Sequence, residues 1–424
     1  MTKMKSDDKT SHNSPSIRFP EFTGEWEKCK LGTLATKVGS GSTPKGGDAV
    51  YTSIGHYFVR SQNVGMGFLM LDNIAHINDD IHQKHKATEI YENDVLLNIT
   101  GASIGRTAVA TKELEGGNVN QHVCIIRTNS KVNPKFLCDY IQTQRIQNHI
   151  KSLQTGGSRE GLNFEQIRSF PISLPSINEQ NKLTCLLDKI NERIATQVRL
   201  IEDLKKLRCA IIENVFCSPN HNESALRFKG NTDPLSTYRM EDFCSRITRK
   251  NKDNQCSLVL TIAAQYGLVD QESFFNKTVA SENLAGYYLL HKGEFAYNRS
   301  YSAGYDWGAV KRLEKYPEGV LSTLYICFKI DESAVDSDYL AYYFESTKWH
   351  KGLSDIAGEG ARNHGLLNVS VNDYFNTRHR FHCMREQKII ASMLNVISQK
   401  ENDEIALYDN YQKQKQYLLR KMFI

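Results

Sequence analysis

Two groups of polar, glycine-punctuated loops carry the side chains of this chain that could do chemistry. They are rich in Arg, Lys, Asn, Gln, Ser and Thr, which bind phosphate oxygens and form hydrogen bonds with base edges. The pattern predicts contact with DNA, although loops of this composition can also be merely solvated. The first group contains Ser42, Thr43, Lys45, Arg60, Gln62, Asn63, Thr100, Ser103, Arg106, Gln121 and Arg159. The second group contains Arg246, Arg249, Lys250, Lys252, Asn298, Arg299, Tyr301, Arg362, Asn363 and His364.

Catalytic signatures are missing from the sequence. The run from Gly39 to Gly47 lacks the Gly-Lys-Ser/Thr ending of a phosphate-binding loop, and the run from Gly101 to Gly105 lacks a dinucleotide fingerprint. Neither an Asn-Pro-Pro-aromatic motif nor an Asp…Glu-x-Lys nuclease core is found. We therefore expect no catalytic residue and no metal site. His122 borders an apolar strand, so we expect a core histidine whose hydrogen bonds are satisfied.

Composition fits an ordinary globular protein. The 424 residues are 40% hydrophobic and 24% charged, which is enough for two or three domains with proper cores. The net charge of +5 permits a nucleic-acid partner without requiring one. No window approaches 18 consecutive apolar residues, and the ten cysteines form no Cys-x-x-Cys pair. We expect a cytoplasmic protein with reduced thiols and no membrane span.

Two long helices must position the polar loops. Residues 179–216 place apolar side chains at steps of three and four, from Leu183 to Val215, which predicts a heptad seam. At 1.5 Å per residue this helix would be about 57 Å long. Residues 386–423 repeat it without a gap at an offset of 207 residues, from Glu386-Gln387 to Phe423. Two unrelated amphipathic helices are the alternative explanation.

The repeat extends into the rest of the chain. Arg18-Phe19 recurs as Arg227-Phe228, and Gly157-Ser158-Arg159 recurs as Gly360-Ala361-Arg362. Each repeat is thus predicted to be a globular domain followed by one long helix, with strands at 95–100, 121–128 and 321–330 and helices at 135–151 and 338–351. The fold class is α+β: two mixed α/β domains and two antiparallel helices with pseudo-twofold symmetry. The expected boundaries are 1–16 for a disordered tail, 17–176 for domain 1, 177–217 for helical spacer 1, 218–237 for a linker, 238–383 for domain 2 and 384–424 for helical spacer 2.

Three motifs carry a family resemblance. The first is Arg18-Phe-Pro-Glu-Phe-Thr-Gly-Glu-Trp26, and the second is Asp94-Val-Leu-Leu-Asn-Ile-Thr-Gly-Ala-Ser-Ile-Gly-Arg106. The third runs from Gly161-Leu-Asn-Phe through Phe170-Pro-Ile-Ser-Leu-Pro175 to Glu179-Gln180. With these motifs the chain, from about residue 17 onward, resembles the specificity subunit of type I restriction-modification systems.

The resemblance implies a non-catalytic protein with two target recognition domains. Each domain would read one half of a split, asymmetric DNA site, and the helices would form an antiparallel coiled coil. Implied partners are two modification subunits, which bind S-adenosylmethionine and methylate adenine, and restriction subunits that use ATP and Mg. No cofactor would bind this chain directly.

The second half departs from the motifs, which bears on the alternatives. It has Phe375 to His382 where the first half has Phe170 to Pro175, and Arg299-Ser-Tyr-Ser-Ala-Gly304 where the first has Thr-Gly-Ala-Ser-Ile-Gly. Two domains this different should read different half-sites. A fused enzyme is disfavoured because its cofactor motif is missing. A two-headed scaffold that binds no DNA, or a silent specificity subunit, remains the alternative.

Overall fold

The chain folds into two compact units. The computed structural model describes residues 13–154, 161–231, 233–276, 283–300, 304–356, 362–363, 366–367 and 369–424. Unit 1 comprises Met1–Gln197 and Leu407–Ile424, and unit 2 comprises Val198–Ala406. Both boundaries fall inside the long helices α5 (Ile177–Val215) and α10 (Met384–Lys421). Each helix therefore contributes one segment to each unit.

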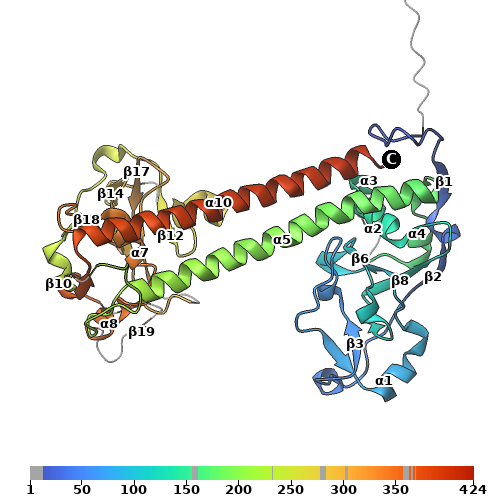
Figure 1. The fold of residues 1–424 in the computed structure, drawn as a ribbon, viewed down its shortest axis with the longest axis horizontal. Helices are drawn as coiled ribbons and strands as arrows, with labels where there is room; N and C mark the ends of the chain where they lie inside the picture. The colour runs from blue at the N-terminus through green and yellow to red at the C-terminus, as the bar shows by residue number, and fades with distance from the viewer. Residues whose placement is uncertain are drawn as a thin grey trace, which may run out of the picture. The chain divides into compact units, whose positions relative to one another are not determined.

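Unit 1 is built on a four-stranded antiparallel sheet of order β2-β8-β5-β6, which is accompanied by a β4-β3-β7 sheet and a β1-β9 pair (Figure 1). All four residues of β5 are buried, as expected of a central strand with both faces covered. The strands are β1 (Glu27–Lys30), β2 (Ala35–Ser40), β3 (His56–Val59), β4 (Ala75–Ile77), β5 (Val95–Asn98), β6 (Thr107–Val109), β7 (Asn118–Val119), β8 (Val123–Thr128) and β9 (Pro171–Leu174). The short helices are α1 (Asp79–Lys84), α2 (Pro134–Gln142), α3 (Gln144–Gln154) and α4 (Phe164–Arg168).

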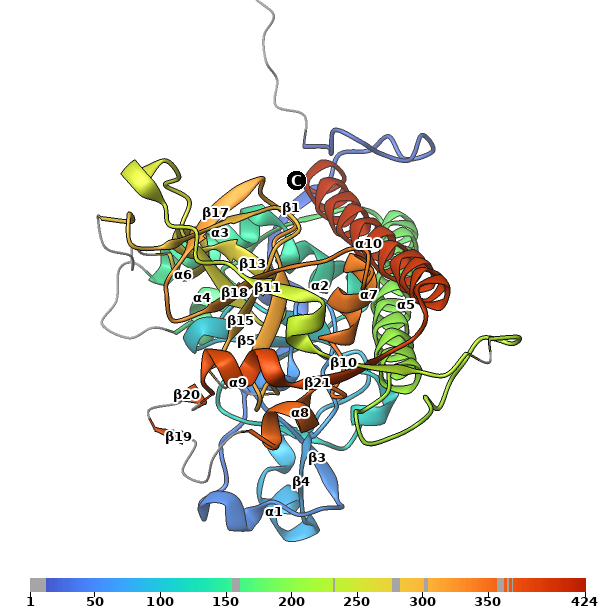
Figure 2. The same ribbon diagram turned by 90° about the vertical axis from the view of Figure 1, so that its left-hand side faces the viewer.

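Unit 2 repeats this plan with a β11-β18-β15-β16 sheet and a β10-β21 pair. Figure 2 shows α8 and α9 next to that pair. The strands are β10 (Ser236–Arg239), β11 (Cys244–Arg246), β12 (Leu260–Ala263), β13 (Gly267–Asp270), β14 (Tyr288–His291), β15 (Phe295–Asn298), β16 (Ala309–Arg312), β17 (Glu318–Leu321), β18 (Ile326–Ile330), β19 (Arg362–Asn363), β20 (Leu366–Leu367) and β21 (Arg378–Phe381). The short helices are α6 (Gln271–Phe275), α7 (Ser337–Tyr343), α8 (His350–Ser354) and α9 (Val371–Asn376).

A phenylalanine just beyond the end of each long helix completes an aromatic cluster. In unit 1, Phe423 stacks on Phe136 with ring centroids 5.4 Å apart and meets Trp26 edge-on at 6.3 Å. In unit 2, Phe216 meets Tyr339 and Tyr343 edge-on at 5.0 and 5.5 Å. Such pairs add roughly 0.5–1.5 kcal/mol each beyond the burial of their area. The two sequence repeats therefore form two equivalent hydrophobic cores.

The beginnings of the long helices are clamped in the same way in both units. The buried Glu179 carboxylate accepts two hydrogen bonds of 2.7 Å from Arg18, and the buried Glu386 carboxylate is paired with Arg227. Unit 1 packs the start of α5 and the end of α10 into one core, whereas unit 2 packs the end of α5 and the start of α10. The two segments in each unit thus run in opposite directions. Coiled-coil packing between them stays a prediction.

The mixed α/β class is confirmed, and the differences from the sequence-based elements are local. The helix expected at 135–151 is broken at Thr143, whose extended backbone separates α2 from α3. The strand expected at 321–330 is the end of β17 and the whole of β18, joined by a turn. The described chain starts at Asn13, four residues before the expected ordered start, and Trp26 N donates to Asn13 O at 2.9 Å.

Candidate nucleic-acid interface

One end of the main sheet of unit 1 gathers most of the first group of candidates. The antiparallel register pairs Ser40 with Cys124, Asn98 with Val123 and Leu97 with Thr107. The loops that leave β2 and β5 therefore lie at the same end as the loops that enter β6 and β8. We call this end the polar end. It carries Ser42, Thr43, Lys45, Thr100, Ser103, Arg106 and Gln121.

Hydrogen bonds tie the loops of the polar end together. Thr43 donates to the side-chain oxygen of Gln121, and Gln121 Nε2 lies 3.1 Å from His122 Nε2. His122 Nδ1 lies 2.6 Å from Thr100 Oγ1, so both ring nitrogens have partners, although the side chain is half-buried and does not lie in the core as expected. Ser42 Oγ lies 3.1 Å from His85 Nδ1. These hydrogen bonds therefore fix the loops relative to one another.

Cations stand unpaired at the polar end. Lys45 and Arg106 are exposed, and within the described residues neither forms an ion pair. Arg60 follows β3 and places its guanidinium carbon 5.5 Å from the centre of the Tyr51 ring, and the neighbouring Gln62 is exposed. Unpaired cations on fixed loops can neutralise phosphates, which is the main source of affinity for DNA.

Asn63 is a correction to the first group. Its side chain is 3% exposed, its Nδ2 donates to Met70 O at 2.9 Å, and its Oδ1 accepts from Arg60 N at 2.9 Å. Because the side chain is buried and both atoms of its amide are used inside the protein, Asn63 builds the turn after β3 and is not available to a ligand. The sequence showed only a polar residue in a loop.

In unit 2 the candidates of the second group lie at two separate places. Asn298 is the last residue of β15 and Arg299 follows it, at the end of the sheet that corresponds to the polar end of unit 1. Asn298 Oδ1 accepts from Ser300 N at 3.0 Å, and the Arg299 guanidinium donates to the backbone oxygens of Val369 and Leu324, each at 3.1 Å. Arg299 is therefore a correction, because its guanidinium holds backbone oxygens, whereas Asn298 shares only its side-chain oxygen and stays a candidate.

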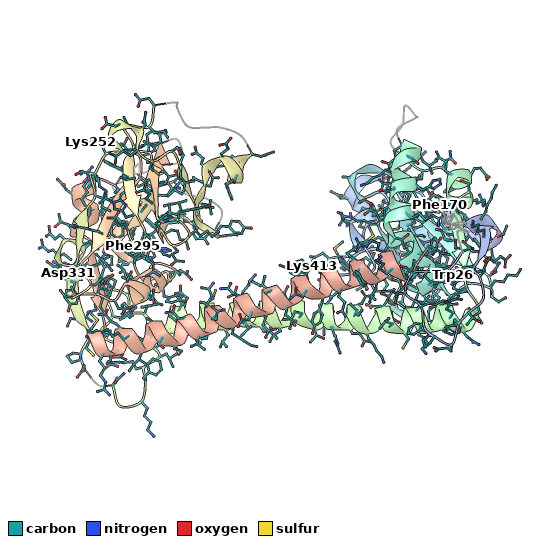
Figure 3. All side chains as sticks on the ribbon, turned by 90° about the horizontal axis from the view of Figure 1, so that it is seen from above. Trp26, Phe170, Lys252, Phe295, Asp331 and Lys413 are labelled. Carbon is teal, nitrogen blue, oxygen red and sulfur yellow. The ribbon has the colours of Figure 1, made fainter. Side chains whose placement is uncertain are left out.

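The other cations of the second group lie beside β14. Arg246 Nη2 donates to the Tyr288 hydroxyl at 3.3 Å, and Lys250 Nζ lies 4.1 Å from the centre of the same ring. Arg249 is paired with Glu294 at 2.6 Å, at the opposite end of β15 from Asn298. Lys252 is exposed and stands away from the core around Phe295 (Figure 3). Unit 2 thus presents a second basic surface along β14.

Three candidates, Arg159, Tyr301 and His364, lie outside the described residues. For Arg362 and Asn363 the structure describes the backbone, which forms β19, and not the side chains.

Sequence reasoning missed two residues that shape the candidate interface. Tyr288 gathers Arg246 and Lys250, but a tyrosine in an apolar run gives no sign of this. Gly41 leaves β2 so close to β7 that a Cβ there would lie 1.6 Å from Val119 O. Its place in a glycine-rich loop was the available signal, since close backbone approach is a common reason for glycine.

Other kinds of site find no support in the described part of the chain. No group of three His, Cys, Asp or Glu side chains there could hold a metal ion. None of the helices in the described ranges is long and apolar enough to cross a membrane.

Comparison with known proteins shows a family that part of the chain resembles. The family model described as "Type I restriction modification DNA specificity domain" matches residues 23–206. This match covers less than half of the 424 residues, and over it the chain is similar to the specificity domain of type I restriction-modification systems. Among curated proteins, this chain is similar to the type I restriction enzyme EcoBI specificity subunit of Escherichia coli, with 24% identity over 135 residues. The match covers 31% of this chain and 28% of that relative, so it spans less than a third of the relative's length.

Two solved structures share the fold of this chain over nearly its whole length. The type I restriction-modification S subunit from M. genitalium matches with a TM-score of 0.56 at 14% identity, covering 97% of this chain and 99% of that one. A chain solved in work on complex assembly and conformational transition of the type I R-M system matches with a TM-score of 0.53 at 15% identity, covering 95% and 98%. At these identities the likeness concerns the fold alone.

Proposed function

We propose that this chain is the DNA-reading, non-catalytic subunit of a type I restriction-modification complex. Each unit reads one half of a bipartite, asymmetric DNA site and directs partner subunits to methylate adenine or to cut. The polar end of unit 1 carries this proposal, because several loops are fixed there by internal hydrogen bonds while Lys45 and Arg106 stay exposed and unpaired among the described residues. Side chains held in place lose little conformational entropy on binding.

The remaining candidates form the proposed interface residue by residue. In unit 1 they are Ser42, Thr43, Lys45, Arg60, Gln62, Thr100, Ser103, Arg106, Gln121 and Arg159. In unit 2 they are Arg246, Arg249, Lys250, Lys252, Asn298, Tyr301, Arg362, Asn363 and His364. The two units differ in these side chains, so two unlike half-sites are expected. We also propose the domain boundaries given by the sequence repeat, because α5 and α10 begin at Ile177 and Met384.

The partners follow from the same proposal. Two modification subunits supply S-adenosylmethionine, and restriction subunits supply ATP and Mg, while this chain binds double-stranded DNA without a cofactor. The complex would act in the cytoplasm, where the DNA is.

Single-molecule methylation mapping tests the proposal. DNA from cells that express this chain with its modification subunits should carry methyl-adenine in a split motif with two unlike halves. No new mark, in cells where the complex is assembled and the modification subunit is active with another specificity subunit, would refute it in favour of a scaffold or a silent subunit.

A matched pair of variants tests the polar end itself. Arg106 and Lys112 are both exposed, but Arg106 precedes β6 and Lys112 follows it, at the other end of the strand. Arg106→Ala should weaken DNA binding and lower the slope of log Kd against log salt by about 1, as expected for one lost phosphate contact. Lys112→Ala should leave both unchanged. Equal effects of the two variants would refute the placement of the interface.

A further inference from the structure

Helices α2 and α7 each join a globular domain to both long-helix segments of their unit. At the start of α2, Asn133 N donates to Gln180 of α5 at 2.8 Å, and at the start of α7, Asp336 N donates to Gln387 of α10 at the same distance. The second contact of each helix is made near its end and involves the other long helix. We call α2 and α7 the bridging helices.

The second contact in unit 1 is made by a buried lysine. Lys415 of α10 is 7% exposed, and its Nζ donates to Oε1 of Gln142 at the end of α2 at 3.1 Å. Gln142 is itself buried and donates to Asp139 at 3.3 Å. Gly67 packs against this pair so closely that a Cβ there would lie 2.7 Å from Gln142 Oε1 and 3.1 Å from Lys415 Nζ. A cation in this place interrupts the apolar seam of α10.

Unit 2 has an arginine in the equivalent place. Arg208 is 207 residues before Lys415 in the helix repeat, and Glu345 is 203 residues after Gln142 in the domain repeat. Arg208 Nη1 is bonded to Glu345 at 2.5 Å, and its Nε is bonded to Glu401 at 3.2 Å. The chemistry differs between the units, but both place one cation of a long helix on the end of a bridging helix. The placement of this cation is therefore kept in both repeats, although the partner side chain differs.

Hydrogen bonds, joined by the covalent step from Gln142 to Ile141 in α2, lead from the buried lysine to the polar end of unit 1. Gln147 Nε2 donates to Ile141 O at the end of α2 at 2.8 Å, and also to Gly105 O at 3.0 Å. Gly105 precedes Arg106. Beside it, Gly67 N donates at 2.7 Å to the backbone oxygen of Thr107, the first residue of β6. The end of α2 is thus fastened to α10 on one side and to the loop of Arg106 on the other.

We propose that Lys415 is a positioning residue for DNA recognition by unit 1, and that it acts through Gln142, Gln147 and the Gly105 carbonyl on the loop of Arg106. The inference rests on the proposed function. The lysine touches no DNA. It fixes where α10 meets the bridging helix, and because that helix also holds the loop, it fixes the orientation of Arg106. Arg208 has the same role for unit 2, with Glu345 as its partner.

The test compares two lysines of one helix in the complete complex with the modification subunits. Lys415→Met keeps most of the side-chain length and removes the cation, whereas Lys413→Met removes an exposed cation two residues earlier (Figure 3). Methylation rates are measured on the mapped site and on sites with one base changed in either half. We expect Lys415→Met to reduce discrimination at the half-site of unit 1 by about tenfold, the effect of losing roughly one hydrogen bond to a charged group. Discrimination at the other half-site, and both values for Lys413→Met, should not change.

Two further variants keep the inference falsifiable if Lys415→Met does not fold. Gln147→Ala, which cuts the link to Gly105 without touching the long helix, should show the same selective loss. Lys415→Arg should restore discrimination, since it keeps the donor. Folded Lys415→Met or Gln147→Ala protein with unchanged discrimination, or with equal losses in both halves, would overturn the inference. A lower melting temperature with unchanged discrimination would show a merely structural lysine. Failure of the proposed function is distinct, because the unmodified complex would then show no sequence preference.

Discussion

The buried Asp139 should make unit 1 less stable as the pH rises. Asp139 is 5% exposed, and burial raises its pKa to about 7 from 3.8. Lys415 and Lys135 oppose this rise, Asp188 adds to it, and the hydrogen bond from Gln142 opposes it. Burial also lowers the pKa of Lys415. A carboxyl whose pKa is raised on folding binds more protons in the folded state, so stability is lost as the pH passes from the unfolded value to the folded one.

The magnitude follows from the two pKa values. A difference of about three units corresponds to about 4 kcal/mol in total, of which about 3 kcal/mol would be lost between about pH 5 and about pH 8. Asp139→Asn keeps the shape and the oxygen that accepts from Gln142, but it does not titrate. The variant should therefore match the unmodified protein near pH 5 and be more stable than it near pH 8.

Hydrogen exchange of peptides from α2 and α3 measures the opening free energy of unit 1 without relying on a two-state transition of the whole chain. Peptides from α7 provide the control, because Asp139 lies in unit 1 only. Parallel pH profiles for Asp139→Asn and the unmodified protein would refute the reasoning, since they would mean that Asp139 is ionised in the folded state at all of these values.

Three other perturbations have defined outcomes. Glu179→Gln should reduce the stability of unit 1 by about 3 kcal/mol, because it leaves the Arg18 cation without its partner, and α5 peptides should exchange faster. Phe423→Ala should cost about 3–5 kcal/mol, seen as lower resistance of unit 1 to proteolysis, with Lys421→Ala as the neutral control. His379 is fully buried and its pKa is lowered to about 3, so unit 2 should lose about 1.4 kcal/mol per pH unit below about 6.5. His379→Gln should reduce this loss of stability at acid pH, as measured by hydrogen exchange. The same loss in the variant would contradict the view that His379 causes it.

The two long helices and the internal repeat of this fold could be predicted from the sequence. The heptad seam and the repeat offset give the two helices, because a periodic apolar face is a local property of the chain. The equivalence of Phe216 with Phe423 also follows from the repeat, and both complete aromatic clusters. The segments that begin at Phe170 and Phe375 differ in sequence, but each leads into an equivalent strand. Strand β21 pairs with β10 in the same way as β9 pairs with β1.

The misassigned details depend on tertiary surroundings. Thr143 breaks the expected helix and donates from its hydroxyl to Tyr140 O at 2.7 Å, a local habit of threonine that could have been anticipated. Asn63 and Arg299 could not have been separated from exposed polar residues, because only the packed structure brings Met70, Val369 and Leu324 to them. Which loops share an end of the sheet depends on strand order, which the sequence does not display.

The division of the long helices between the units has a consequence for biosynthesis. Unit 2 is one continuous stretch, Val198–Ala406, whereas unit 1 needs Leu407–Ile424 to finish a core that begins with Trp26. During synthesis from the N-terminus, the earlier domain must wait with an incomplete aromatic cluster until Phe423 has left the ribosome. Unit 2 can therefore complete its fold first, although most of unit 1 is made before it. The nascent first domain would be the aggregation-prone species during this interval.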